Sequence, residues 1–146
     1  MRPYQFFLPF IFLTGAKSVS AGNDNTIKRE IVFYETGQIK EERYFKNGEK
    51  HGTWTAWYEN GEKKMEQSFN DGQPDGKWIH WYENGQRRYV LTFINGKLQG
   101  KWTEWYENGA KWHVVNYKNG DVTGKWAFWE NDGTKKAEGM YGIPGS

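Results

Sequence analysis

Aromatic and polar residues alternate along this chain in short runs that are separated by glycine-containing turns. The clearest example lies between Gly76 and Phe93, where two aromatic-rich runs flank Asn84-Gly85. An Asn-Gly pair between such runs is the strongest short-range signal for a β-hairpin, because both residues accept positive backbone φ angles. No stretch has the 3.6-residue periodicity of an amphipathic helix. The pattern therefore predicts a meander of about ten short strands.

The pattern repeats every 24 residues without insertions, and we call one such repeat a unit. Three aromatic columns keep this register: Trp54, Trp78, Trp102 and Trp126; Trp57, Trp81, Trp105 and Trp129; and Phe45, Phe69, Phe93, Tyr117 and Tyr141. Glycine columns keep it as well. Strict periodicity of this kind is typical of repeat architectures. The sequence predicts an all-β fold, an elongated single-layer antiparallel sheet of about five tandem 24-residue β-hairpin repeats.

The first residues differ from the repeats and resemble a secretory signal peptide, which we predict over residues 1–21. Arg2 precedes an apolar run, residues 6–13, and the small residues Val19 and Ala21 suit the positions before a cleavage site. The run is shorter than the roughly 20 apolar residues that span a bilayer. A buried strand or a membrane-skimming segment is the alternative. A signal peptide predicts a periplasmic or extracellular location.

The rest of the chain divides by composition. We predict a flexible lead-in over residues 22–29, the repeat array over residues 30–141 and a C-terminal tail over residues 142–146. The ends of the array are degenerate, as is common for the caps of repeat proteins. In the first unit Glu30 and Phe33 occupy the two Trp positions.

Composition narrows the classes of function. The chain has no Cys, which excludes disulfides, thiolate zinc sites and cysteine nucleophiles. Residues 1–21 contain Arg2 and Lys17 and no acid, so without them the 20 basic residues fall to 18, equal to the 18 acidic ones. A neutral mature chain lacks the basic character that nucleic acids and anionic lipids attract. We therefore expect no nucleic-acid partner and disfavour membrane lipid.

A two-residue type I′ turn at Asn84-Gly85 would place Trp81 opposite Arg88 and would give the sheet two different faces. The predicted first face carries Trp78, His80, Tyr82, Arg87, Tyr89, Leu91 and Phe93, and the second face carries Lys77, Ile79, Trp81, Glu83, Gln86, Arg88, Val90 and Thr92. The aromatic first face is the better candidate for the core. The second face mixes rings with polar groups, as binding surfaces do. Its candidate binding residues are Trp57, Trp81, Trp105, Trp129 and Trp112. Alternatively, these rings pack unit against unit.

Candidate catalytic chemistry is missing from the sequence. The three histidines, His51, His80 and His113, share no repeat column and have no metal-ligand spacing to one another. Ser68 lacks the surroundings of a nucleophile elbow. Glu83 recurs before Asn-Gly in three units, which favours a turn role over a single perturbed carboxylate. We expect no enzymatic activity, no cofactor and no metal.

The stretches Gly76–Gly85 and Gly100–Gly109, both of the form Gly-Lys-Trp-x-x-Trp-Tyr-Glu-Asn-Gly, resemble the bacterial variant of the MORN (membrane occupation and recognition nexus) repeat. In particular, residues 30–141 are similar to the YwqK-type antitoxin-component family of toxin–antitoxin systems. The resemblance implies consecutive hairpins, no catalysis and a role in protein–protein or membrane association. An antitoxin would have a toxin partner. A signal peptide departs from this picture and fits an immunity protein that acts outside the cytoplasm.

Three binding functions follow as hypotheses. The first is a non-enzymatic scaffold for protein–protein interaction, of the antitoxin or immunity kind. The second is a module that binds glycans or cell walls, because Trp and Tyr rings on hairpins can stack on sugars. The third is a membrane-associated MORN-type protein. A homo-oligomer would cover the open edges and faces that a single-layer sheet leaves exposed.

Overall fold

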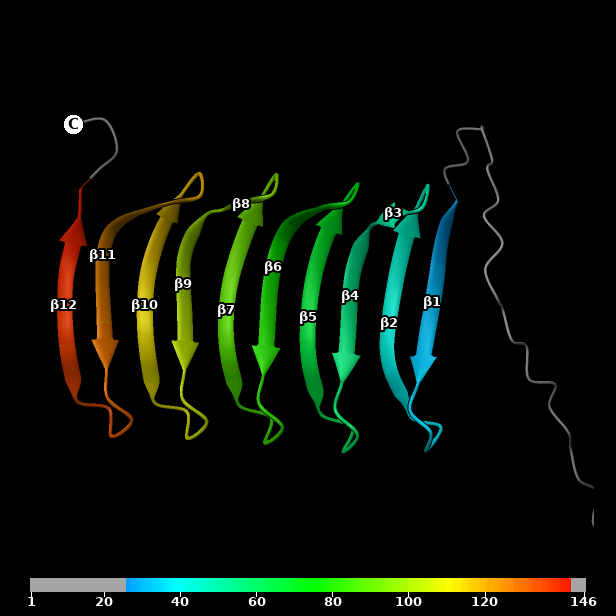
Figure 1. Cartoon of the computed structure of the whole chain (residues 1–146), viewed down its shortest axis with the longest axis horizontal. Coiled ribbons are helices and arrows are strands. Elements are labelled where there is room, and N and C mark those ends of the chain that lie inside the picture. The colour runs from blue at the N-terminus through cyan, green and yellow to red at the C-terminus, as the bar shows by residue number, and fades with distance from the viewer. Residues whose placement is uncertain (1–25, 143–146) are drawn as a thin grey trace, which may run out of the picture.

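The computed structural model of the chain describes residues 26–142, which form one antiparallel sheet (Figure 1). The predicted signal peptide and most of the lead-in lie outside the described residues. The strands are β1 (Ile27–Phe33), β2 (Ile39–Lys46), β3 (Glu49–Lys50), β4 (Gly52–Trp57), β5 (Lys63–Asn70), β6 (Gln73–Trp81), β7 (Arg87–Ile94), β8 (Lys97–Leu98), β9 (Gly100–Trp105), β10 (Lys111–Lys118), β11 (Asp121–Trp129) and β12 (Lys135–Tyr141). The described part contains no helix that could cross a membrane.

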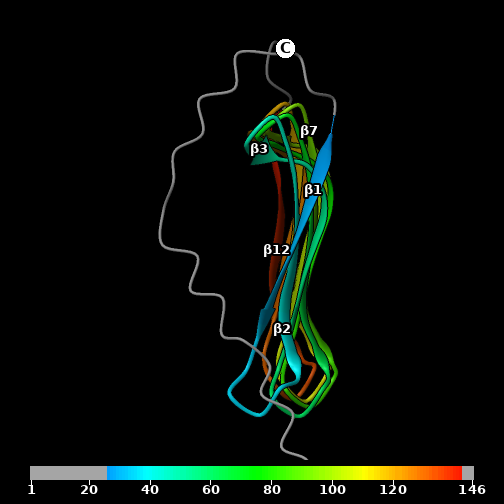
Figure 2. The same cartoon turned by 90° about the vertical axis from the view of Figure 1, so that its right-hand side faces the viewer.

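Ten strands follow one another across the sheet in chain order, and the two-residue strands β3 and β8 pair beside β2 and β7. Seen edge-on, the strands form a single layer with no second layer over either face (Figure 2). The predicted all-β array of hairpins is therefore confirmed. The array begins earlier than predicted, because β1 starts at Ile27, which pairs with Lys46 of β2. Residues 27–29 thus belong to the sheet and not to a flexible lead-in.

The predicted type I′ turn at Asn84-Gly85 is wrong. The carbonyl of Tyr82 accepts a hydrogen bond from the Gly85 N–H at 3.0 Å, and Gly85 has a φ of 80° whereas Asn84 does not have a positive φ. This geometry is a type I turn followed by a glycine bulge. Positive φ angles at two successive residues occur instead at the other end of each hairpin, as at Asn95 and Gly96 with φ of 48° and 75°. The type I′ turns therefore join one unit to the next.

The glycine bulge, together with a second bulge at Arg88, changes which residues share a face. Trp81 pairs with Arg87 and not with Arg88, while Trp78 still pairs with Leu91 as predicted. Arg88 approaches Glu104, which pairs with Tyr89 of the first face. The predicted faces are therefore right except near the bulge, where Arg87 moves to the second face and Arg88 to the first.

The first face holds the array together through a ladder of aromatic rings. Successive ring centroids lie 5.1, 5.3, 5.3 and 4.8 Å apart along the series Phe45, Trp54, Phe69, Trp78 and Phe93. Such tilted and edge-to-face contacts are favourable beyond the area that they bury. The buried apolar residues of the described chain, Ala56, Phe69 and Leu91, lie on this face. The expectation that the first face is the packed one is confirmed.

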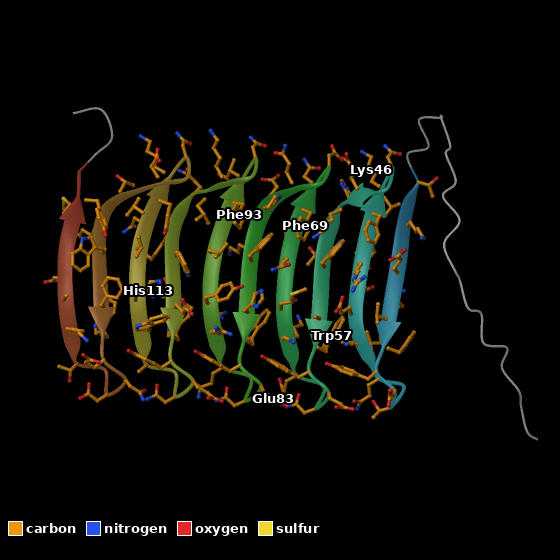
Figure 3. All side chains as sticks on the ribbon, in the orientation of Figure 1. Lys46, Trp57, Phe69, Glu83, Phe93 and His113 are labelled. Carbon is orange, nitrogen blue, oxygen red and sulfur yellow. The ribbon has the colours of Figure 1, made fainter. Side chains whose placement is uncertain are left out.

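Each of the three central units is also bonded to the next by its Tyr-Glu-Asn-Gly turn. The Tyr82 hydroxyl donates to the Trp105 carbonyl at 2.8 Å, and the Asn84 amide donates to the Glu107 carbonyl at 2.9 Å. Equivalent bonds recur 24 residues earlier and later along the row of turns that includes Glu83 (Figure 3). Asn84 also accepts from the Gln86 N–H at 3.0 Å, which fixes its own turn. The repeated turn motif is therefore a device for stacking units.

Removing one such bond gives the first testable prediction. Tyr82→Phe should lower the free energy of unfolding by about 1 kcal/mol, because it leaves the Trp105 carbonyl without its donor. Tyr89→Phe is the matched control, since the Tyr89 hydroxyl has no hydrogen-bond partner among residues 26–142. Its effect should stay below about 0.5 kcal/mol. Urea unfolding of both variants measures the difference, and equal losses would contradict a bonding role for Tyr82.

The outer strands differ from the inner ones. In the last unit Glu130 and Asp132 stand at the Tyr and Asn positions of the stacking motif. As carboxylates they accept hydrogen bonds but cannot donate them. The edge strands β1 and β12 also carry exposed charges, among them Lys28 and Lys136. Charged side chains on an edge strand disfavour pairing with a further strand.

Candidate interaction surface

Four of the five predicted binding residues form one row on the second face, near the glycine-bulge ends of the strands. They are Trp57, Trp81, Trp105 and Trp129, and each is half-buried. Figure 3 shows Trp57 at this end of β4, whereas Phe69 lies toward the other end of β5. Each Trp pairs across the hairpin with a basic residue: Lys63, Arg87, Lys111 and Lys135 respectively.

Trp112 does not belong to this row, and its prediction as part of the same surface is wrong. It is the extra residue of a second bulge, three residues beyond the turn glycine Gly109, as Lys64 and Arg88 are in earlier units. Its ring lies 4.9 Å from His113 and 6.1 Å from Tyr106, and 41% of the residue is exposed. The bulge turns this residue to the first face, where it is an exposed ring of its own.

Basic side chains lie beside the rings of the Trp row. The ammonium group of Lys63 is 6.0 Å from the centre of the Trp81 ring, and that of Lys111 is 5.8 Å from the centre of the Trp129 ring. Contacts of this kind combine a cation–π attraction with burial of the lysine stem. The Trp row is therefore partly covered by neighbouring units and partly accessible. It has features of both interpretations of the sequence, a binding surface and packing of unit against unit.

A shallow depression of about 800 Å³ lies on the second face over β9 to β12. Its lining includes Lys101, Lys111 and Lys125 together with Asn116 and Trp129. The depression is open and mainly basic, and the carboxylate of Glu138 also lines it. It suits the side chains of a partner better than it suits an enclosed small molecule.

The first face carries a polar cluster that sequence reasoning did not single out as a site. Glu104 and His113 are buried at its centre, with the carboxylate Oε2 3.9 Å from the imidazole Nδ1. Burial raises the pKa of Glu104 and lowers the pKa of His113, so each is shifted toward its neutral form. Arg88 lies 3.8 Å from the other carboxylate oxygen. The signal in the sequence was a break in the repeat, because the Glu104 column also holds Ala56 and Phe128.

His80 lies in the same column and is held in a neutral form. Burial, followed by the positive charges of Arg88 and Lys64, lowers its pKa from 6.5 to about 4. Its imidazole stacks on the Tyr89 ring at 4.3 Å and lies 3.1 Å from the Gln67 amide. Within residues 26–142 no group of three His, Asp or Glu side chains could hold a metal ion.

The His80 shift predicts a loss of stability in mild acid. As the pH falls from 7 to 4.5, the unfolded state takes up a proton at about 6.5 and the folded state resists it, so the free energy of unfolding falls by on the order of 2 kcal/mol. His80→Phe should remove this part of the pH dependence. Phe is chosen because Phe128 occupies the same repeat position in a later unit. Urea unfolding at the two pH values tests it. An unchanged pH dependence in the variant would contradict the assignment to His80.

Comparison with known proteins assigns the repeat to a family. The model of the MORN repeat variant matches residues 28–47, 50–71, 74–95 and 98–119, which together exceed half of the chain. The chain belongs to the MORN repeat variant family. Each matched segment of the MORN array runs from one inter-unit turn toward the next and contains one glycine-bulge hairpin.

The MORN array extends beyond the four matched segments. The hairpin of β11 and β12 has the same ring ladder position, with Trp126 and Tyr141 6.0 Å apart, and it completes five hairpins in the described chain. No curated protein matches the chain significantly. The family assignment therefore rests on the repeat itself, and a repeat scaffold of this kind is consistent with a role in interactions.

Proposed function

We propose that this MORN array is a non-enzymatic scaffold that binds a protein partner across its second face. The proposal is supported by a difference between the two faces of the sheet. The first face contains the ring ladder and the buried apolar residues, whereas the second face presents a row of half-buried Trp rings among basic side chains. Exposed aromatic rings near long charged side chains are typical of interaction surfaces.

The rigidity of the array supports this function. A Tyr hydroxyl bonds each of the first four units to the next, and an Asn amide does so in three of them, so the spacing of surface residues is set by the sheet. A preorganised surface loses little conformational freedom when a partner binds. Similarity to antitoxin components supports a more specific form of the proposal, in which the partner is a toxin or another effector that the array covers. A signal peptide over residues 1–21 would place this interaction outside the cytoplasm.

Affinity capture from the source cells tests the proposal. The bait is the full chain, and the comparison is the double variant Trp81→Ala/Trp105→Ala, checked for its β-sheet circular dichroism. We expect one protein to be retained in stoichiometric amount by the wild type and to be lost with the folded variant. Retention of cell-wall or membrane material alone, with no protein partner, would contradict the proposal and favour a glycan or lipid ligand.

A further inference from the structure

Charge on the array is distributed by face, although residues 26–142 contain 18 basic and 17 acidic residues. The second face holds the carboxylates Glu42, Glu66 and Glu138, which pair there with Thr55, Ile79 and Ala127 respectively. Each of these carboxylates already forms an ion pair with a cation of the neighbouring strand or of its own strand: Arg29, Lys63 and Lys135. The acidic charge of this face is thus neutralised locally.

The centre of the second face keeps unpaired cations. Between β6 and β11, and away from the type I′ turns, it carries five exposed basic residues that form no ion pair within residues 26–142, namely Lys77, Arg87, Lys101, Lys111 and Lys125. Of the carboxylates of this region, Glu104 lies on the first face and Glu83 and Glu107 lie in turns. Asp75 and Asp121 lie near the starts of β6 and β11, next to the type I′ turns, where Asp121 pairs with Lys118. The central second face is therefore basic, although the whole array has a formal net charge of only +1, from 18 basic and 17 acidic residues.

The cations form two rows with an apolar band between them. Lys77, Lys101 and Lys125 recur toward one end of their strands, and Arg87 and Lys111 lie beside the Trp row at the other end. The band between the rows consists of Ile79, Val90, Thr103, Val114 and Ala127. A ligand that lies across the strands would meet apolar surface and Trp rings in the middle and positive charge on both sides.

Resting on the proposed function, we infer that this basic second face binds an extended acidic, proline-containing segment of the partner protein, with the segment running perpendicular to the strands. Successive Trp residues are two strands apart, which is about 9.5 Å. A polyproline II chain advances about 9.3 Å in three residues, so every third residue meets an equivalent ring. Prolines of such a segment stack on aromatic grooves, and its acidic residues match the unpaired lysines.

The apolar band favours a polypeptide over an acidic polysaccharide. Sugar hydroxyls that are buried against side chains such as Ile79, Val90 and Val114 would lose water without gaining hydrogen bonds, which is unfavourable. Proline rings and methylene groups lose nothing of this kind against the same band. The surface chemistry therefore selects an extended peptide that carries its charge at the margins.

Fluorescence anisotropy with labelled synthetic peptides tests the inference on the full chain. The probe is a Glu-Pro-Pro repeat of about twelve residues, which spans about 37 Å and exceeds the roughly 28 Å between the outer Trp residues. The matched neutral probe is a Gln-Pro-Pro repeat of the same length, and an oligogalacturonate of similar length represents acidic glycans. We expect the acidic peptide to bind at least tenfold more tightly than the neutral one and to weaken as salt increases.

Two double variants locate the site. Lys101→Gln/Lys125→Gln removes cations from the second face and should weaken binding of the acidic peptide by about tenfold. Lys40→Gln/Lys64→Gln removes the same charge from the first face, where these lysines lie over Tyr34 and Tyr58, and should change binding by less than about twofold. Circular dichroism checks the fold of both variants.

Equal weakening by the two variants, or equal binding of the acidic and neutral peptides, would overturn the inference. Tighter binding of the oligogalacturonate than of the acidic peptide, with the same sensitivity to Lys101→Gln/Lys125→Gln, would also overturn it and would assign the face to a glycan. The affinity capture tests the scaffold proposal separately from the peptide inference. If the affinity capture retains a protein partner that Lys101→Gln/Lys125→Gln still binds, the scaffold proposal stands and the peptide inference fails.

Discussion

Replacing Trp78 with alanine is expected to lower the free energy of unfolding by about 3 kcal/mol, at the lower end of the range for buried aromatic rings. Trp78 lies in the middle of the ring ladder, 5.3 Å from Phe69 and 4.8 Å from Phe93 between ring centroids. Its indole N–H donates to the Ser68 carbonyl at 3.0 Å. The variant therefore loses contacts to two neighbouring strands and leaves a carbonyl without its donor.

Phe33→Ala is the matched control for Trp78→Ala. Phe33 occupies the position of the second Trp in the first unit, it lies on the edge strand β1, and 56% of it is exposed. Its removal should cost about 0.5 kcal/mol. Urea unfolding followed by Trp fluorescence and by circular dichroism gives both values. Equal losses would contradict a linear array in which each interface depends mainly on its neighbours.

Gly76→Ala is expected to have the next largest effect, a loss of about 3 kcal/mol. Gly76 has a φ of 101°, which side chains rarely adopt, and a Cβ there would lie 2.9 Å from the Cβ of Ser68 on β5. Positive φ alone costs an alanine about 1–2 kcal/mol. The close approach to Ser68 adds overpacking strain, because the backbone of β5 has to move.

The equivalent glycine of the next unit separates these two causes. Gly100 also has a positive φ, of 77°, but a Cβ there would have no atom within 4 Å. Gly100→Ala should therefore cost only about 1–2 kcal/mol. The double variant Gly76→Ala/Ser68→Gly should recover part of the loss, as measured by thermal unfolding. A loss at Gly76 no larger than that at Gly100 would show that the steric contact is unimportant.

The fold class could be predicted because the 24-residue period repeats in several columns at once. Three aromatic columns and the turn glycines all require the same hairpin, so single exceptions such as Glu30 or Glu130 do not obscure it. The assignment of the first face as the packed side was also predictable, because alternation along a strand depends only on the central pairing of Trp78 with Leu91.

The turn types could not be predicted from the dipeptides alone. Asn84-Gly85 and Asn95-Gly96 have the same sequence, yet the first forms a type I turn with a glycine bulge and the second a type I′ turn. The difference does not depend on a contact between units, because Thr36-Gly37 and Asp132-Gly133 form the same turn without an Asn amide. In the turn at Asn84 the side-chain oxygen accepts from the Gln86 N–H, and a second bulge at Arg88 and at Trp112 moves these two residues to the first face.

The polar cluster of the first face was missed for another reason. Sequence reasoning gave weight to positions that recur, whereas His80 and Glu104 occupy one column in which every unit has a different residue. Recurring residues serve the packing that all units share, as the Tyr82 hydroxyl bond shows. Positions whose residue varies from unit to unit are not needed for this shared packing. At these positions one unit can therefore differ in chemistry from the next.

The central claim is that the first face holds the array together and the second face binds the partner. Hydroxyl-radical footprinting of the full chain, alone and with the partner retained in affinity capture, tests it most directly. Trp81, Trp105 and Trp129 report on the second face, and Trp112, which is 41% exposed, reports on the first. The account predicts that the partner protects the three Trp residues of the row and leaves Trp112 unchanged. Protection of Trp112 with no change in the row would contradict it.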